Sequence, residues 1–529
     1  MAAEVESSAL PPETGRGAVA RAAGVIALGS LLSRVLGLVR ESTLSHFFGT
    51  SGAASAFFLV REIPQKLYDL LVGGHISAAL VPVFSEYTDA ERRAELWRIA
   101  SVFCSLAAVA LAAVVLLVEV GAPWIITVMA GGWPADLQQE ATFLLRLISP
   151  ALLFMGLTGA VMGLLYALKR FSYPAFVTAL FNGGIVVAVL VGQEHLGVAS
   201  AALGVLLGSV LQLVLQFPGL RGTRLRPTLR FSHPALRRIL GLYLPVVFGV
   251  AINIVRDVVD RRLASGLGEH SISQMGYATT LIQTALGLIA AAISLAILPS
   301  LSRADAAGDE QGYQANLGLG LRLILTLVLP ATAVLYFLGR PIVSLFLEHG
   351  AFTAGDTTIV TWALYLYLLS LPFAAVDQLL IFAFYARKDT LRPNLVGAYV
   401  VGIYLLFALP FVGQWGLFAL VIANSAQWIW HTVLMLLLLR RHIGWPQGQR
   451  IGATLGRSLL AAVLMGLSAW GTATLLEWAL GTAGLGNRLV TVAAGAAVGI
   501  AVYLGLAMLL RLEEIWVVWK AVRRKLGRP

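Results

Sequence analysis

The chain has 529 residues, of which 58% are hydrophobic and 12% are charged, and its formal net charge is +11. Soluble globular domains contain about 25% charged residues, so this composition excludes a soluble protein and predicts a polytopic membrane protein. The single cysteine, Cys104, excludes an intrachain disulfide. We expect no nucleic-acid partner despite the positive charge, because the basic residues gather in loops between apolar segments.

Apolar segments follow one another along the chain, and each is long enough to form a membrane-spanning helix, which needs about 20 residues. They predict an all-α fold of about fourteen transmembrane helices. The segments lie at about 18–47, 53–86, 96–120, 138–167, 173–194, 198–218, 238–267, 272–302, 315–339, 356–386, 393–412, 415–439, 456–478 and 489–511. A tail at 1–17 precedes them. A basic tail at 512–529 follows them and is typical of an amphipathic helix at the membrane surface.

The loops between these segments alternate in basicity. One side carries 28 of the 38 lysines and arginines, including six arginines in the 221–238 loop. The loops of the other side carry only Arg340 and Arg488. Basic loops stay in the cytoplasm, so we expect both termini of this multi-pass protein to be cytoplasmic.

Two stretches recur at a nearly constant spacing. Residues 76–85 match residues 293–302, which lie 217 positions later. The motif that begins at Tyr166 matches the motif that begins at Tyr385, which lies 219 positions later. Six predicted spans separate the copies, so the two halves have the same orientation and form a parallel repeat, with cargo expected between them. The predicted division is an N-lobe, a C-lobe and a C-terminal pair of helices, at 18–220, 221–440 and 441–511.

The first predicted span contains arginine within its membrane-embedded part, where a charge is energetically unfavourable. Only twelve residues separate Arg21 from Arg34, so a span here must contain at least one arginine. A charge near the bilayer centre costs roughly 3 kcal/mol and usually faces a water-filled cavity or a partner. Arg34 and Arg40 have no opposite charge three or four residues away. We therefore predict that Arg34 faces a polar path. Arg40 either does the same or reaches the outer interface.

The embedded charges of the predicted spans 1, 2 and 7 have a net charge of +2. Arginine suits phosphate because its planar group binds two oxygens at once. We therefore expect an anionic cargo, bound by Arg34, Arg40, Arg61, Lys66, Arg256 and Arg261. An alternative for the seventh span is structural pairing along one helix, Arg256 with Asp260 and Asp257 with Arg261, each four residues apart.

Three further residues are candidates for a role in transport. Gly73 and Gly74 predict a bend that a gate could use, although close helix packing is an equal alternative. Asp377 is a lone embedded acid and a candidate ion or proton site, with a hydrogen bond to a neighbouring helix as the alternative. The sequence has no nucleophile–base set, metal-ligand cluster or phosphate-binding glycine loop, so we expect no enzyme activity and no cofactor. A secondary or potential-driven transporter remains.

Several motifs resemble the MurJ/MviN family of lipid II flippases, over about 20–440. They are Ser33–Gly37 with Arg40, Ala56–Phe58, Val81–Pro82, Arg170–Phe176 with Asn182, Leu298–Ser302 and Phe384–Asp389. The resemblance implies two six-helix lobes, as in the multidrug/oligosaccharidyl-lipid/polysaccharide exporter superfamily. It also implies a cavity lined by spans 1, 2, 7 and 8 and a lipid-tail groove formed by spans 13 and 14.

The same resemblance implies a function in peptidoglycan biosynthesis in the bacterial inner membrane. A monomer would move lipid II, an undecaprenyl-diphosphate-linked precursor, between leaflets among membrane phospholipids. Three family charge positions hold Ser55, Tyr68 and Thr280 here, and Arg61, Lys66 or Arg256 could compensate. The alternatives are a flippase for another polyprenyl-diphosphate glycan, a cation-coupled exporter of small molecules and a non-transporting membrane scaffold.

Overall fold

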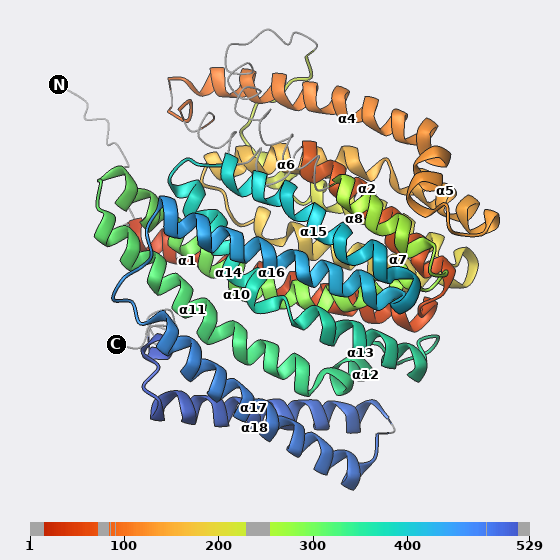
Figure 1. Cartoon of the computed structure of the whole chain (residues 1–529). Helices are drawn as coiled ribbons and strands as arrows, with labels where there is room; N and C mark the ends of the chain where they lie inside the picture. The colour runs from red at the N-terminus through yellow and green to blue at the C-terminus, as the bar shows by residue number, and fades with distance from the viewer. Residues whose placement is uncertain are drawn as a thin grey trace, which may run out of the picture.

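The computed structural model describes residues 15–71, 84, 86–89, 91–228, 254–482 and 484–516, and every regular element in these ranges is helical (Figure 1). The bounded helices are α1 (Gly15–Phe48), α2 (Gly52–Leu71), α4 (Arg93–Ala130), α5 (Ala135–Ile148), α6 (Ala151–Ala167), η1 (Pro174–Phe176), α7 (Val177–Leu196), α8 (Ala199–Val214), η2 (Phe217–Leu220), α10 (Ser271–Ala306), α11 (Glu310–Phe337), α12 (Gly339–Leu347), α13 (Ala354–Leu368), α14 (Leu371–Ala386), α15 (Leu391–Trp415), α16 (Leu417–His442), α17 (Ile451–Leu480) and α18 (Leu485–Leu509). A further helix covers 254–265.

The described helices confirm the predicted all-α membrane fold. Ten helical stretches among the described residues are long and apolar enough to cross a membrane, and the pair α13–α14, bent by 47°, is an eleventh when it is counted as one span. The predicted spans 1, 2 and 7 correspond to α1, α2 and the 254–265 helix, although the start of the seventh span and the end of the second lie outside the described residues. Gly73 and Gly74 also lie outside them, so their predicted gating role is not placed.

Breaks within two of the predicted spans follow from local sequence. The span predicted at 356–386 divides after Leu368, just before Pro372 of α14, because proline cannot donate a backbone hydrogen bond to a preceding turn. Pro150 stands between α5 and α6 in the same way within the span predicted at 138–167. The two breaks lie at corresponding places of the proposed halves.

Backbone conformation repeats along the chain as the sequence does. Lys169 and Lys388 lie 219 residues apart and have φ angles of 59° and 60°. Gly197 and Gly416 have the same spacing, and each has φ 53°. Left-handed lysines are uncommon because Cβ crowds the backbone there, so their recurrence at one spacing agrees with the predicted duplication. The lobe boundaries themselves stay a prediction.

Small residues let the helices approach closely. α7 and α8 cross at Gly184 and Gly208, where a Cβ on Gly208 would lie 2.5 Å from the Phe181 carbonyl oxygen. α1 crosses η1 at Gly29, where a Cβ would lie 2.1 Å from the Ala175 carbonyl oxygen. In lipid there is no hydrophobic driving force for helices to associate, so close backbone packing of this kind stabilises the bundle.

One end of the bundle joins the two proposed lobes by hydrogen bonds around the turn at 49–51, and we call it the turn end. The Ala351 amide donates to the His46 carbonyl at 2.8 Å, and the Tyr277 hydroxyl donates to the Gly49 carbonyl at 3.0 Å. The Thr50 hydroxyl donates to the Asp356 carboxylate at 2.5 Å. These bonds satisfy polar groups of the turns and close this end of the bundle.

α17 and α18 form a hairpin along one side of the bundle, against α11 and α12 (Figure 1). The Tyr503 hydroxyl of α18 donates to the Thr326 carbonyl of α11 at 2.6 Å. Glu514, just beyond α18, is buried and pairs with Arg322 at 3.2 Å. The basic tail that follows, from residue 517, lies outside the described residues.

We expect Gly208→Ala to destabilise the protein by about 1–3 kcal/mol, because the new methyl group meets backbone that cannot move aside. The matched control is Gly402→Ala in α15, where a Cβ would have nothing within 4 Å. That change should leave the midpoint of thermal unfolding in detergent equal or higher, since alanine favours a helix over glycine. Equal midpoints for the two variants would contradict the close crossing of α7 and α8.

Candidate functional site

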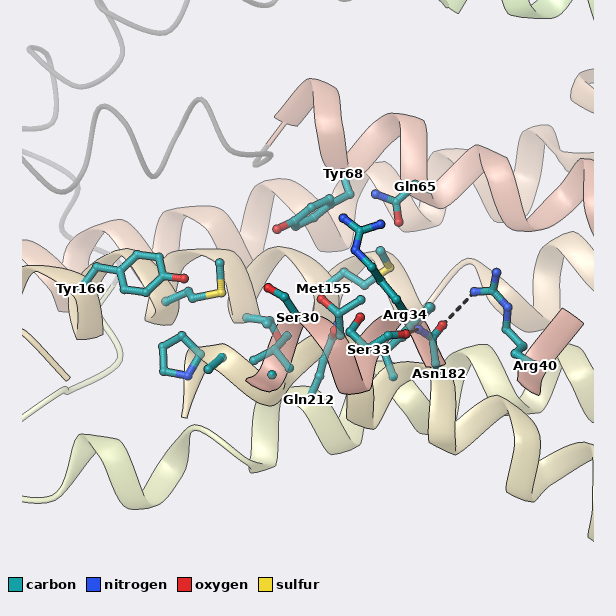
Figure 2. Close-up of a pocket in the computed structure, with 18 residues that line it drawn as sticks. Ser30, Ser33, Arg34, Arg40, Gln65, Tyr68, Met155, Tyr166, Asn182 and Gln212 are labelled. Carbon is teal, nitrogen blue, oxygen red and sulfur yellow. Dashed lines mark hydrogen bonds between the residues drawn. The ribbon is translucent and has the colours of Figure 1, made fainter. Parts of the chain in front are cut away.

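A polar cavity of about 620 Å³ lies among α1, α2, α6, α7 and α8. It reaches from Tyr166 and Pro174, at the end opposite the turn end, to Arg40 on α1. Figure 2 shows its polar side chains converging from several helices. The lining residues are Gly29, Ser30, Ser33, Arg34, Arg40, Gln65, Tyr68, Met155, Thr158, Met162, Tyr166, Pro174, Ala175, Val177, Thr178, Phe181, Asn182 and Gln212.

Arg34 extends from α1 into this cavity, with its guanidinium group on the side of α2 that carries Tyr68 and Gln65 (Figure 2). Its Nη1 donates to the Thr284 carbonyl oxygen of α10 at 3.2 Å. Gly287, one turn along α10, leaves room for the group, since a Cβ there would lie 2.4 Å from Arg34 Nη2. Among the described residues, no carboxylate forms an ion pair with Arg34. The prediction that Arg34 faces a polar path is therefore supported by its position.

Arg40 belongs to a different environment. Its Nη1 donates to Asn182 Oδ1 at 2.8 Å, and its Nη2 pairs with Glu41. Glu41 is 2% exposed and also accepts from Arg61 at 3.1 Å, while the Arg61 guanidinium lies 4.0 Å from the centre of the Phe58 ring. The guanidinium of Arg40 is thus held inside the bundle, which makes the alternative of reaching the outer interface wrong for this conformation.

A second group of charges joins α2 to the 254–265 helix. Arg261 donates to both carboxylate oxygens of Glu62, at 2.7 and 3.2 Å. Lys66 Nζ lies 2.7 Å from Asp257, which also pairs with Arg256. The two pairs link the proposed lobes, because Glu62 and Lys66 are one turn apart on α2 and face opposite charges on its neighbour.

The two pairs weighed as an alternative along the seventh span, Arg256 with Asp260 and Asp257 with Arg261, are therefore not the ones that form among the described residues. Arg256 donates to the adjacent Asp257 and to Gln427 Oε1, the latter at 3.2 Å. Arg261 donates to Glu62. Asp260 accepts a hydrogen bond from the Tyr404 hydroxyl at 2.6 Å. Arg261 binds Glu62 on another helix rather than an acid one turn away on its own helix. A bidentate pair forms two parallel hydrogen bonds, which add both energy and geometric specificity.

The six predicted binding cations consequently divide into two sets. Arg34 and Arg40 line the cavity, whereas Arg61, Lys66, Arg256 and Arg261 are in ion pairs outside its lining. The described acids of these networks are Glu41, Glu62, Asp257 and Asp260. Six positive and four negative groups leave a net charge of +2 in this region.

Three positions that are charged in the resembling family carry no charge here. The Ser55 hydroxyl bonds to Ser273 at 3.0 Å, and the Thr280 hydroxyl donates to the Gly276 carbonyl at 3.0 Å. Tyr68 lines the cavity. Arg61, Lys66 and Arg256 were the candidates to compensate, but each already has a carboxylate partner. The free positive charge of the described cavity lining therefore comes from Arg34.

Sequence reasoning missed two amides of this site as functional residues. Asn182 is 5% exposed and donates to the Ser33 carbonyl at 3.1 Å while it accepts from Arg40, so it fixes α7 against α1. Gln212 of α8 also lines the cavity. Their signal in the sequence is a strongly polar side chain within an apolar segment, which in a membrane usually faces a partner or a cavity.

Asp377, the candidate ion or proton site, lies within α14 and is fully buried. Its Oδ1 lies 2.7 Å from His431 Nδ1 of α16, and its Oδ2 has no hydrogen-bond partner among the described residues. The hydrogen bond to a neighbouring helix that was weighed as the alternative is present.

An apolar groove of about 630 Å³ runs beside the cavity, between α10, α11 and the α17–α18 hairpin. It meets the surroundings of Arg34 at two residues. Leu38 lies one turn beyond Arg34 on α1, and Thr284 supplies the carbonyl to which Arg34 donates. The groove wall from α17 and α18 includes Met465, Val492, Ile500, Tyr503 and Leu504.

Comparison with known proteins identifies the family. The family model described as lipid II flippase MurJ matches residues 44–486. The lipid II flippase MurJ of Burkholderia cenocepacia is 30% identical over 495 residues, which cover 90% of this chain and 94% of that protein. The probable lipid II flippase MurJ of Vibrio cholerae is 27% identical, over 93% of this chain and 96% of that protein.

Solved structures share the fold. A structure of lipid II flippase MurJ in an inward closed conformation superposes with a TM-score of 0.76 and 24% identity, over 92% of this chain and 98% of that chain. An inward-facing multidrug-resistance transporter of the MATE family, from the MOP superfamily, has a TM-score of 0.66 and 14% identity, over 78% and 94% of the two chains. The match of the family model over most of the chain, together with these relatives, shows that the chain belongs to the MurJ family of lipid II flippases.

Proposed function

We propose that the protein moves lipid II from the inner to the outer leaflet of the bacterial cytoplasmic membrane, as a monomer that works by alternating access. The observation that carries this proposal is Arg34. It is a cation with no carboxylate partner among the described residues, in a polar cavity at the edge of an apolar groove. A lipid whose headgroup begins with a diphosphate needs these two environments side by side.

Charge complementarity supports a diphosphate cargo. A diphosphate carries about two negative charges, and the charged network around the cavity has a net charge of +2. Attraction between arginine and phosphate is strong where water is excluded and both oxygens can be bound. In our proposal Arg34 binds the diphosphate first, and Arg40, held by Asn182 and Glu41, comes next along α1.

The apolar groove would hold the polyprenyl tail. Moving a hydrocarbon tail from lipid into a protein groove gains little free energy, because lipid tails are as apolar as leucine. The groove therefore orients the cargo, and the headgroup charges supply the recognition. This division of roles explains why the groove adjoins the Arg34 site at Leu38 and Thr284.

In the proposed orientation both termini are cytoplasmic and the turn end faces the periplasm. The described form is then closed on the periplasmic side, by the bonds around residues 49–51 and by the ion pairs of α2 with the 254–265 helix. Release of the cargo requires these contacts to break. Glu62–Arg261 and Lys66–Asp257 are suited to this, because the net free energy of a buried ion pair is small.

Substitution of Arg34 tests the cargo proposal. We expect Arg34→Ala to lose complementation of a cell depleted of its lipid II flippase, with normal abundance in the membrane. A hydrogen bond to a charged group contributes about 1.5–3 kcal/mol, so transport should fall by about tenfold or more. Arg34→Lys should restore growth only in part, because lysine lacks the planar fork of arginine.

The control is Arg262→Ala, which removes an exposed arginine from the 254–265 helix outside the cavity lining. It should support normal growth. Normal growth with Arg34→Ala at equal abundance would show that Arg34 is not needed for transport and would contradict the proposal. If the protein moves another polyprenyl-diphosphate glycan, even the unsubstituted protein would fail to complement. Arg34 would still be required for transport of that other cargo.

Labelling of introduced cysteines tests the orientation. In a Cys104→Ala background, Ser51→Cys and Ala354→Cys should react with an impermeant thiol reagent in whole cells, because both belong to the turn end. Arg224→Cys, in the interlobe loop, should react only after the membrane is opened. The reverse pattern would place the turn end in the cytoplasm and make the proposed direction of closure wrong.

We also propose Asp377 as the ion or proton site of the transport cycle, on the basis of its buried and unpartnered Oδ2. Asp377→Asn keeps a hydrogen-bonding group beside His431 but loses the charge, and we expect it to lose transport while the protein remains folded. The control is Thr432→Val, which removes a neighbouring α14–α16 hydrogen bond, from Thr432 to the Phe373 carbonyl at 2.9 Å. Equal loss in both variants would show that Asp377 only joins the helices.

A further inference from the structure

A second polar cavity, of about 540 Å³, lies near the turn end between α12, α13 and the α17–α18 hairpin. It is distinct from the apolar groove. Ile342 and Phe346 of α12 face the groove, whereas Pro341, Ser344 and Glu348 face the cavity. A buried apolar cluster separates the two spaces and consists of Leu338, Ile342, Ala469 and Ala473.

Two of the charged residues around this cavity are fully engaged with the protein. Arg488 donates to the carbonyls of Thr482, Ser344 and Glu348, at 3.1, 3.2 and 2.8 Å, and pairs with the Glu348 carboxylate at 2.8 Å. The other Glu348 oxygen accepts from the Thr357 hydroxyl at 2.7 Å. This pair fixes the start of α18 against α12, and its charges cancel.

Two other charged residues of the lining remain available to a ligand. Arg340 is exposed and Glu477 is half-exposed, and within the described residues neither forms an ion pair. Thr491, in contrast, is only 2% exposed, yet its hydroxyl has no hydrogen-bond partner there. A buried hydroxyl normally finds a partner, so one is expected from a molecule that enters the cavity. The available charges have opposite signs, which suits a zwitterion.

The cavity also lies beside a surface suited to lipid. Trp470 lines it and is 54% exposed, as tryptophans at membrane interfaces commonly are. Leu467 and Val463 lie on the same face of α17, one and two turns further from the turn end, and are 46% and 41% exposed. A headgroup in the cavity would therefore continue into acyl chains along this apolar face.

We propose that this cavity binds the headgroup of a zwitterionic phospholipid, phosphatidylethanolamine. Its phosphate binds Arg340 and accepts a hydrogen bond from the Thr491 hydroxyl, while its ammonium group binds Glu477. Arginine, hydroxyl and carboxylate groups together match a phosphate and an amine on one molecule. The site does not depend on the proposed cargo, because the apolar cluster separates it from the groove and Arg34.

Native mass spectrometry of the full-length protein in detergent tests this site with added phosphatidylethanolamine or phosphatidylglycerol. One phosphatidylethanolamine should stay bound, with an affinity that falls about tenfold or more in Arg340→Gln, as expected for loss of a charge-assisted bond. Glu477→Gln should weaken phosphatidylethanolamine by a similar factor and leave phosphatidylglycerol, which has no amine, unchanged. Thr491→Val should weaken both lipids.

The matched controls are Arg262→Gln and Glu194→Gln, which change exposed residues near the same end of the bundle and should bind both lipids normally. Unchanged phosphatidylethanolamine binding in Arg340→Gln and Glu477→Gln, at unaltered melting temperature, would overturn the proposal. So would one-for-one displacement of the lipid by undecaprenyl diphosphate, because the site would then belong to the cargo. A failure of this kind leaves the Arg34 test of the flippase proposal unaffected.

Discussion

The cost of a charge in hydrocarbon governs how this bundle is assembled. Each embedded arginine or lysine would cost roughly 3 kcal/mol if it faced lipid. The protein meets this cost by placing opposite charges on helices that touch, as with Glu62 and Arg261 or Glu41 and Arg61. Arg34 stands apart, since its described partner is only a helix carbonyl and the space around it is polar. Of the six cations predicted to bind the cargo, the one without a carboxylate partner among the described residues therefore lies in the cavity.

The same ion pairs connect stability to movement. An apolar interface of equal extent would resist separation, whereas a buried ion pair loses in desolvation much of what it gains in attraction. Pairs such as Lys66–Asp257 can therefore hold the two proposed lobes in register and still exchange for contacts with water in the proposed transport cycle. Close crossings such as Gly184 with Gly208 instead pack backbone against backbone.

The two polar cavities and the apolar groove described above differ in their chemistry. The groove is apolar, the Arg34 cavity is cationic, and the cavity near Arg340 offers both signs of charge. Because the membrane gives apolar groups no preference for the groove over lipid, polar groups at its ends must determine what binds and where. α12 and the α17–α18 hairpin contribute residues to both the groove and the cavity near Arg340.

The sequence alone determined the all-α membrane fold and its apolar spans, and it predicted a repeat and the exceptional position of Arg34. These follow from local properties: apolar length, spacing of matching residues and distance along one helix to the next opposite charge. Only the tertiary structure decided which charges meet. Arg256 and Arg261 have acids one turn away in sequence yet bind others, and Asp377 meets His431 across 54 residues. Such choices depend on which faces of two helices touch, because side chains on different helices can meet at better geometry than neighbours on the same helix.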